Sequence, residues 1–273
     1  MSEANSGQRA DWNGDSGRRW VADAERRDRV LKPVQDALLS AARIGEAEDV
    51  LDVGCGCGAV TLAAAELTTG KVTGVDLSEP MLTAARQRAG EPGQVAFIEA
   101  DAQTCDYSLT VDLVISRFGT MFFDDPAAAF ANIRRAVRED GRLCVATWQP
   151  LAANEWLSVP GAVLRRYAEL PLPDPPGPGM FSQSDPEAVA AVLAAAGWHD
   201  ASVAALRVDL RVGTDPADAA DYLAATGPAR RVLATLDPGR RSAALAAVTR
   251  AMNDHVSDGV QLKAGINIIR AVA

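Results

Sequence analysis

The stretch LDVGCGCGAV, residues 51–60, places three glycines at alternate positions directly after a short apolar run. Residues 49–53 contain β-branched valines and end at the glycines, which predicts a buried strand that leads into a turn. Because Gly54, Gly56 and Gly58 lack a Cβ, the backbone can approach a ligand and adopt turns closed to other residues. The helix expected next offers free N–H groups and a positive dipole, which suit a carboxylate or a phosphate.

The two cysteines inside this loop raise the alternative of a thiol or metal site. Cys55 and Cys57 form a C-x-C pair, and no nearby histidine completes a tetrahedral set of ligands. We therefore interpret them as small loop residues and predict no bound metal. Four cysteines in a chain of 273 residues also do not make a disulfide framework.

Strands and helical segments alternate five times from the glycine loop onward. Further strands are expected at residues 71–77, 95–100, 111–116 and 143–148, and two more at 202–212 and 260–272. Such alternation is typical of an open parallel sheet covered by helices on both faces. The predicted fold class is α/β, with a Rossmann-like, mostly parallel, seven-stranded sheet and helical lid and cap insertions.

The chain divides into three predicted parts. Residues 1–44 form an N-terminal arm, flexible for about the first 17 residues, and helices that cover the ligand site, and residues 45–150 form the ligand-binding core. Residues 151–273 supply a lid, cap helices and the final strands. The proline-rich segment LPLPDPPGPGMF, residues 170–181, belongs to the lid, and helices near 215–254 form a second cap. Neither segment resembles a separate domain.

Charge and composition exclude several classes of partner. The net charge of −9 and the pI near 4.8 argue against binding to nucleic acid or to an anionic membrane surface. The polar N-terminus lacks an apolar signal core, and no apolar run is long enough for a membrane span. We expect a cytoplasmic protein, monomeric or homodimeric, with a small-molecule partner.

Two acidic residues refine the prediction for the glycine loop. Asp76 follows Gly54 by 22 residues at the end of the second strand, where a carboxylate can accept both hydroxyls of a ribose. The spacing G-x-G-x-G leaves Ala59 where a dinucleotide fingerprint has its last glycine. Asp101 ends the third strand and can bind an adenine amino group. These features count against an NAD-dependent dehydrogenase, which stays open as a minor alternative.

At these residues the sequence resembles the class I S-adenosylmethionine-dependent methyltransferases. The resemblance covers roughly residues 45–150 and is nearest to the small-molecule branch that includes the ubiquinone and menaquinone biosynthesis enzymes. The stretches that carry it are LDVGCGCG, GVDLSEPML, EADAQ, VDLVISRFGTMFF and GRLCVATW. It implies S-adenosylmethionine as the cofactor and in-line methyl transfer to an O, N or C nucleophile of a small molecule. A non-catalytic protein that only binds the cofactor is the main alternative.

The resemblance also implies which residues form the cofactor site. The residues carried over by position are Asp52, Gly54, Cys55, Gly56, Gly58, Asp76, Leu77, Met81, Asp101, Ala102, Ser116, Arg117 and Phe118. Trp12 and Trp20 either fold back over the cofactor or only pin the N-terminal segment down.

Aromatic and apolar residues after the fourth and fifth strands are candidates for the acceptor pocket. The candidates are Phe118, Met121, Trp148, Trp156 and Phe181, with ordinary packing as the alternative. Phe122 and Phe123 are assigned to the core. A phenol or enol acceptor would call for a general base, for which His255 and Asp124 are weak candidates.

Overall fold

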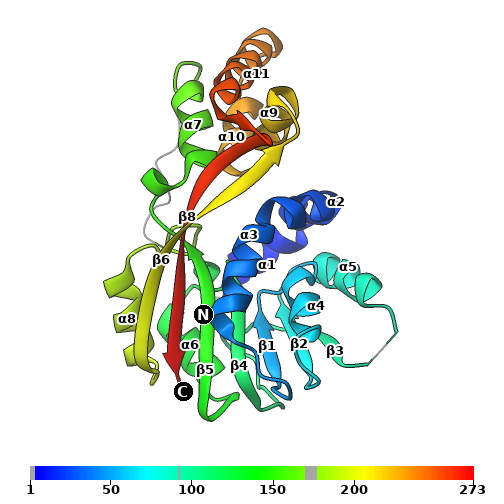
Figure 1. Ribbon diagram of the computed structural model, residues 1–273, viewed down its shortest axis with the longest axis vertical. Coiled ribbons are helices and arrows are strands. Elements are labelled where there is room, and N and C mark those ends of the chain that lie inside the picture. Colours follow the sequence, from blue (N-terminus) through cyan, green and yellow to red (C-terminus); the bar gives the residue numbers. More distant parts are fainter. Residues whose placement is uncertain (1–3, 92, 170–176) are drawn as a thin grey trace.

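The central sheet has the strand order β3-β2-β1-β4-β5-β8-β6, with the short β7 paired to β8 (Figure 1). This computed structural model describes residues 4–91, 93–169 and 177–273. The strands are β1 Val50–Val53, β2 Val72–Asp76, β3 Val95–Glu99, β4 Val111–Arg117, β5 Val137–Trp148, β6 His199–Gly213, β7 Val256–Ser257 and β8 Gly259–Val272. The predicted seven-stranded, mostly parallel sheet is confirmed. Neighbouring strands in the series β3-β2-β1-β4-β5 pair in parallel, and β8 and β6 add two antiparallel strands.

The order of the strands sets the place of the ligand site. The chain runs outward from β1 through β2 to β3 and then crosses to β4 on the other side of β1. In open α/β sheets the crevice at such a reversal, outside the carboxyl ends of the strands, binds ligands. The glycine loop follows β1 at this point.

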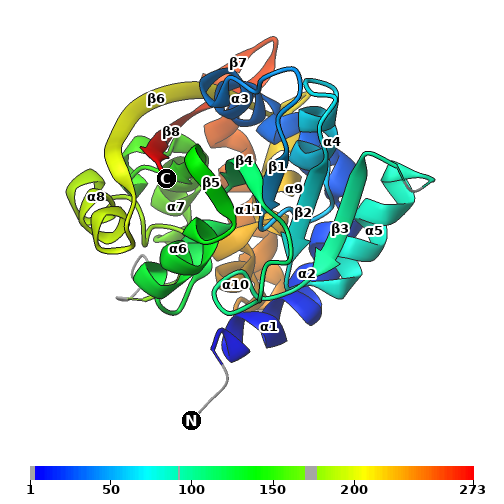
Figure 2. The same ribbon diagram turned by 90° about the horizontal axis from the view of Figure 1, so that it is seen from below.

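Helices cover both faces of the sheet, because alternate strand residues point to opposite sides. Val50, Leu113 and Ile115 pack with α3 (Ala24–Ala42) and α4 (Ala59–Ala65), while Leu51 and Val114 pack with α6 (Pro126–Arg134) and α8 (Pro186–Ala195). Figure 2 separates α3 from α6 and α8 on the two faces. Within the described residues, no helix is long and apolar enough to cross a membrane.

Most helices after β2 begin at a capping side chain followed by proline. Ser78 caps α5 (Glu79–Ala89), as predicted, with the Met81 N–H 3.4 Å from its Oγ. Asp125 caps α6 and Asp185 caps α8 in the same way. An N-cap acceptor satisfies a backbone donor that the helix leaves free, and proline fits the first turn.

A helical cap lies beyond the carboxyl ends of the strands (Figure 1). It contains α7 (Glu155–Leu164), α9 (Pro216–Ala225), α10 (Gly227–Ala234) and α11 (Pro238–Met252), and β6 and β8 extend upward to carry it. The cap has an apolar cluster of its own, which includes Leu164, Val232 and Val248. The two predicted insertions therefore form one body. Residues 170–176 of the predicted proline-rich lid lie outside the described residues.

The prediction of a flexible N-terminal arm is wrong. Residues 6–22 form α1 (Ser6–Asn13) and α2 (Asp15–Ala22), which lie over the carboxyl ends of the strands. A Cβ at Gly17 would come within 1.8 Å of the Trp12 carbonyl oxygen, so glycine permits the close packing of the two helices. The Ser78 hydroxyl donates to the same carbonyl at 2.7 Å. Tertiary contacts therefore order a segment whose polar composition suggested disorder.

Candidate active site

A cavity of about 600 Å³ lies between the carboxyl ends of the parallel strands and the cap. Its sheet half is lined by the glycine loop and by the ends of β2 and β3. Its cap half is lined by residues from α7, α9 and α10, and the N-terminal helices close one side. The volume is typical of a small-molecule site.

The glycine loop leaves its backbone exposed to the sheet half of the cavity. Gly54 and Gly56 have φ values of 70° and 54°, in the left-handed region that glycine adopts at no steric cost. A Cβ on Gly54 would lie 2.5 Å from the Cα of Gly119, so glycine at this position permits the close approach of two loops. A Cβ on Gly56 would meet only Met81 and Trp20, at 3.4 Å or more, and both of these residues line the cavity.

Asp76 ends β2 and faces the cavity beside the glycine loop. Its two carboxylate oxygens accept hydrogen bonds from the Gly56 N–H at 2.8 Å and from the Ser78 N–H at 2.9 Å. Burial raises the pKa of this carboxyl, against the opposing effect of the two backbone donors. Each oxygen retains acceptor capacity, so the carboxylate can accept two neighbouring hydroxyls from a ribose.

Asp52, the last but one residue of β1, carries an unsatisfied acceptor into the cavity. Its Oδ2 accepts from the Thr61 hydroxyl at 2.7 Å, while Oδ1 has no hydrogen-bond partner among the described residues. Burial raises the pKa of Asp52 to about 6, although the nearby charge of Arg117 opposes this. An unpaired buried acceptor is costly. A ligand that donates from an ammonium group would remove that cost, which fits the amino acid end of S-adenosylmethionine.

The carboxylate of Asp101 is held from the N-terminus by Asn5, a residue that sequence reasoning missed. The Asn5 side-chain amide donates to both oxygens of Asp101, at 2.8 and 3.0 Å, and the Gln103 N–H donates to one of them at 2.9 Å. Asn5 is only 1% exposed and has a φ of 53°. The carboxylate has up to four acceptor positions, so one stays open for an adenine amino group.

Asp124 holds Asn5 in place and does not reach the cavity. Its carboxylate accepts from the Asn5 backbone N–H at 2.6 Å, and its own N–H donates to the Asn5 side-chain oxygen at 2.8 Å. Asp124 is exposed and is absent from the cavity lining. His255 lies in the short helix η3 (Asn253–His255), also outside the lining. The structure therefore corrects the prediction of either residue as a general base.

Two residues that were predicted to bind the cofactor lie outside the cavity lining and support the glycine loop. Ser116 is fully buried, and its hydroxyl donates to the Val53 carbonyl at 2.6 Å, which ties β4 to β1. A Cβ on Gly58 would meet Phe97 at 2.9 Å and Ala85 at 3.1 Å, so this glycine permits helix packing. These two positions differ from the rest of the residue set carried over from the resemblance, because they lie outside the cavity lining.

The other predicted cofactor and acceptor residues come together in the lining of one cavity. They are Trp12, Trp20, Asp52, Gly54, Cys55, Gly56, Asp76, Leu77, Met81, Asp101, Ala102, Arg117, Phe118, Met121, Trp148, Trp156 and Phe181.

Stacked aromatic rings line the cavity where its two halves meet. The rings of Phe118 and Trp148 stack with centroids 4.0 Å apart, and Trp156 follows 5.1 Å beyond Trp148. Phe118 has a φ of 70°, which is rare for a bulky residue and marks backbone strain at the end of β4. Such strain concentrates at functional sites.

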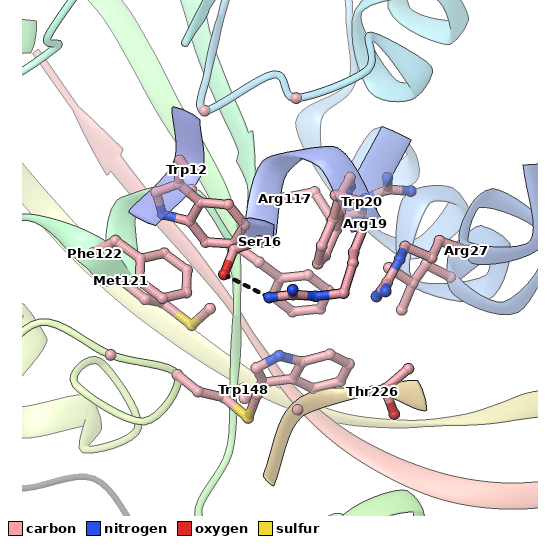
Figure 3. A pocket seen from close by; sticks show the side chains of 18 of the residues that line it. Trp12, Ser16, Arg19, Trp20, Arg27, Arg117, Met121, Phe122, Trp148 and Thr226 are labelled. Atoms are coloured by element: carbon pink, nitrogen blue, oxygen red, sulfur yellow. Dashed lines mark hydrogen bonds between the residues drawn. The ribbon is translucent and has the colours of Figure 1, made fainter. Parts of the chain in front are cut away.

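The N-terminal helices add a second aromatic group, shown in Figure 3. Trp12 contacts Trp20 and Phe122 edge to face, with centroids 5.8 and 5.4 Å apart. Phe122 thus faces the cavity, contrary to its assignment to the core. Phe123 is buried, packs against Phe130 and also borders the cavity.

The loop cysteines are buried thiols. Burial raises the pKa of Cys57 to about 11 and that of Cys55 well above its usual value, so neither forms a thiolate near neutral pH. Within residues 4–91, 93–169 and 177–273, no group of three or more His, Cys, Asp or Glu side chains is arranged to hold a metal ion. Cys55 instead fills the space behind Gly74, where a Cβ would lie 2.8 Å from its sulfur.

Comparisons with known proteins identify the family. The model of a family described as "Methyltransferase domain" matches residues 50–141. The chain is 31% identical to nocamycin O-methyltransferase of Saccharothrix syringae over 243 residues, which cover 84% of this chain and 86% of that protein. It is 34% identical to aklanonic acid methyltransferase DauC of Streptomyces sp. strain C5 over 101 residues, 35% of this chain and 46% of that one.

Solved structures share the fold. A phosphoethanolamine N-methyltransferase 2 of Haemonchus contortus, in complex with phosphomonomethylethanolamine and S-adenosylhomocysteine, aligns with a TM-score of 0.57. The alignment covers 97% of this chain and 58% of that chain at 17% identity, so it bears on the fold alone. The family match and the long alignment to the nocamycin enzyme place the chain in the class I S-adenosylmethionine-dependent methyltransferases, and the shared fold agrees with this placement.

Proposed function

We propose that the sheet half of the cavity holds S-adenosylmethionine, that the cap half holds the acceptor, and that the chain methylates an acceptor oxygen in secondary metabolism. The observation that carries this proposal is the continuity of the cavity. A single lining runs from Asp76 and the glycine loop, past Phe118, to Trp156 and Phe181 under the cap. Cofactor and acceptor can therefore meet in one space that the cap and the N-terminal helices flank.

Each part of the sheet half fits one part of the cofactor. Asp76 would accept the ribose hydroxyls, and the free oxygen of Asp52 would accept from the amino acid end. Asp101 and Ala102 would meet the adenine edge, with Met81 against the ring. When bound, S-adenosylmethionine supplies a methyl group that is activated by its positive sulfur.

The chain's own contribution to the reaction is placement and exclusion of water. In-line transfer needs the acceptor atom aligned with the methyl group, and alignment of this kind accounts for much of the rate enhancement in two-substrate reactions. The stacked pair Phe118 and Trp148 lies between the two halves and would orient a flat acceptor. Trp12 and Phe122 would close the opposite side. Bulk water competes poorly in such an apolar enclosure.

The choice of oxygen as the methylated atom rests on the relatives. The nocamycin enzyme, which aligns along most of both chains, is named an O-methyltransferase. The second relative is named for an acid. We also propose that the chain acts in the cytoplasm as a monomer or homodimer, in keeping with its four free cysteines.

Calorimetric titration of the purified chain with S-adenosylmethionine and with NAD tests this proposal. One S-adenosylmethionine per chain with a micromolar dissociation constant, about −8 kcal/mol, is expected, and NAD should bind much more weakly. Tight NAD binding without S-adenosylmethionine binding would overturn the placement of the cofactor. Light scattering on the same sample gives the oligomeric state, and a tetramer or larger assembly would contradict that part.

A further inference from the structure

Arginine supplies all the cationic side chains that line the cavity within the described residues. Lys32, Lys71 and Lys263 lie elsewhere, as do His199 and His255. Most of the arginines are already engaged or open to solvent. Arg117 is buried next to Asp28, 3.7 Å away, and Arg27 lies over the Trp20 ring at 4.3 Å. Arg165 and Arg231 are exposed at the rim, which leaves two arginines to be accounted for.

Arg19 and Arg230 line the cavity from two different helices, with little compensation of their charge. Arg19, on α2, hydrogen-bonds to the Ser16 hydroxyl at 3.3 Å and lies 3.9 Å from the exposed carboxylate of Asp15. Arg18 already binds that carboxylate at 2.6 Å. Arg230, on α10, is half-buried, and its side chain has no hydrogen bond or ion pair among the described residues. In Figure 3 the Arg19 side chain extends into the space between Trp12 and Trp148.

The two arginines share one electrostatic environment. The pKa of Asp15 is lowered chiefly by its hydrogen bond with Arg18, then by the charges of Arg18 and Arg19, and also by the charge of Arg230 on the cap. Arg19 on α2 and Arg230 on α10 both belong to the lining of the one cavity. Like charges that face one space are unfavourable unless an anion lies between them. Guanidinium groups also match the planar geometry of a carboxylate.

Among the lining residues that the structure describes, none is a base suited to deprotonating an ordinary hydroxyl. Burial raises the pKa of Tyr222 and that of Cys57, to about 12 and about 11. Asp28 is held by Arg88 at 2.7 Å and faces Arg117. Asp11 is exposed and accepts from the Ser16 hydroxyl at 2.8 Å. The remaining lining carboxylates, Asp52, Asp76 and Asp101, belong to the sheet half.

We propose that the acceptor is an organic acid already ionised at neutral pH, with a flat apolar body, and that Arg19 and Arg230 bind its anionic group. This rests on the proposed function and specifies its substrate class. The anion is a carboxylate or a vinylogous equivalent, in which two oxygens share one negative charge. One oxygen is held by a guanidinium, and the other remains free to react. The apolar body lies against Trp148 and Trp12.

The reaction then needs no proton transfer. A lone pair of the acceptor oxygen forms the new oxygen–carbon bond to the methyl group while the carbon–sulfur bond of the cofactor breaks. The electron pair of that bond stays on sulfur, which gives S-adenosylhomocysteine. The negative charge of the acceptor and the positive charge of the sulfonium cancel, and the product is a methyl ester or a methyl enol ether. The described residues of the cap half supply no base, which is consistent with this chemistry.

Binding of two matched probes tests the inference. The probes are 2-naphthoate and its neutral counterpart 2-naphthamide, titrated by tryptophan fluorescence with and without S-adenosylhomocysteine. The wild-type chain should bind the acid about tenfold or more tightly than the amide, since charge-assisted hydrogen bonds distinguish the two. The Arg19→Ala, Arg230→Ala double variant should lose this preference. Arg18→Ala removes the same charge from the outer side of the same helix and should keep it.

Equal binding of acid and amide by the wild-type chain would overturn the inference, and so would a preference that survives in the double variant. The Arg19→Lys, Arg230→Lys variant preserves the charge and should retain part of the preference, which separates lost charge from a disturbed fold. Circular dichroism of every variant checks folding. Titration with S-adenosylmethionine on the same preparations separates this inference from the proposed function: normal cofactor binding without an acid preference would refute the acid acceptor alone.

Discussion

Replacing Asp76 with asparagine tests the cofactor half of the site most sharply. The substitution keeps the size of the side chain but removes the charge that would accept both ribose hydroxyls. The two present donors, the Gly56 and Ser78 N–H groups, would then face one amide oxygen and one amide NH₂ group. A hydrogen bond to a charged partner contributes about 1.5 to 3 kcal/mol. Two weakened bonds should therefore cost about 3 kcal/mol, or roughly a hundredfold in affinity.

Isothermal titration calorimetry with S-adenosylmethionine measures this loss directly, and thermal unfolding shows how much of it is structural. Glu79→Gln is the matched control, because it removes the same charge three residues later from an exposed side chain paired to Arg86. The control should bind within about twofold of the wild type. If Asp76→Asn folds normally and binds within about threefold of the wild type, Asp76 does not accept the ribose and the reasoning fails.

Three further predictions follow from the same geometry. Asp52, with a pKa of about 6, must lose its proton to receive a cationic amino group, so affinity for S-adenosylmethionine should rise from about pH 5 to about pH 7. Asp52→Asn should flatten this rise in pH-dependent calorimetry, and an unchanged profile would assign the titration elsewhere. Asn5→Ala removes the buried bonds to Asp101 and should speed S-adenosylhomocysteine release about tenfold in stopped-flow fluorescence; an unaltered rate would mean that the N-terminal helices do not cover the cofactor. Cys55→Ser with Cys57→Ala should bind the cofactor nearly as well as the wild type and contain no metal by elemental analysis, whereas stoichiometric zinc in the wild type alone would establish a metal site.

Local patterns in the sequence were enough for the sheet and for the center of the site. A strand, a glycine turn and the start of a helix are encoded within ten residues around Gly54. Asp76 ends β2, and Asp101 follows two residues after the end of β3. Because the carboxyl ends of parallel strands share one edge, these residues had to meet there. The direction in which a strand residue faces was harder to predict. Ser116 lies on the predicted strand, but its hydroxyl donates to the Val53 carbonyl between β4 and β1 and does not face the cavity.

Contacts between distant segments were not predictable in the same way. Asn5 meets Asp101 across 96 residues of sequence, and no periodicity marks an asparagine in a polar arm. The packing of the N-terminal helices requires glycine at position 17 and a hydrogen bond from the Ser78 hydroxyl to the Trp12 carbonyl. These contacts form only in the folded chain. Arg230 lines the same cavity as Arg19 because β6 and β8 carry the cap beyond the carboxyl ends of the strands. An arginine-rich sequence gives no sign of which arginines share a cavity.

The most direct test of the account is transfer of a labelled methyl group to a small molecule. The purified chain is incubated with S-adenosylmethionine that carries a deuterated methyl group and with a low-molecular-mass extract of the source organism, and the products are separated by mass spectrometry. The account predicts one small organic compound that carries the deuterated methyl group, with one S-adenosylhomocysteine released for each group transferred. Stoichiometric cofactor binding with no labelled compound, and with no S-adenosylhomocysteine above the level without extract, would contradict it and would identify a protein that binds the cofactor without catalysis.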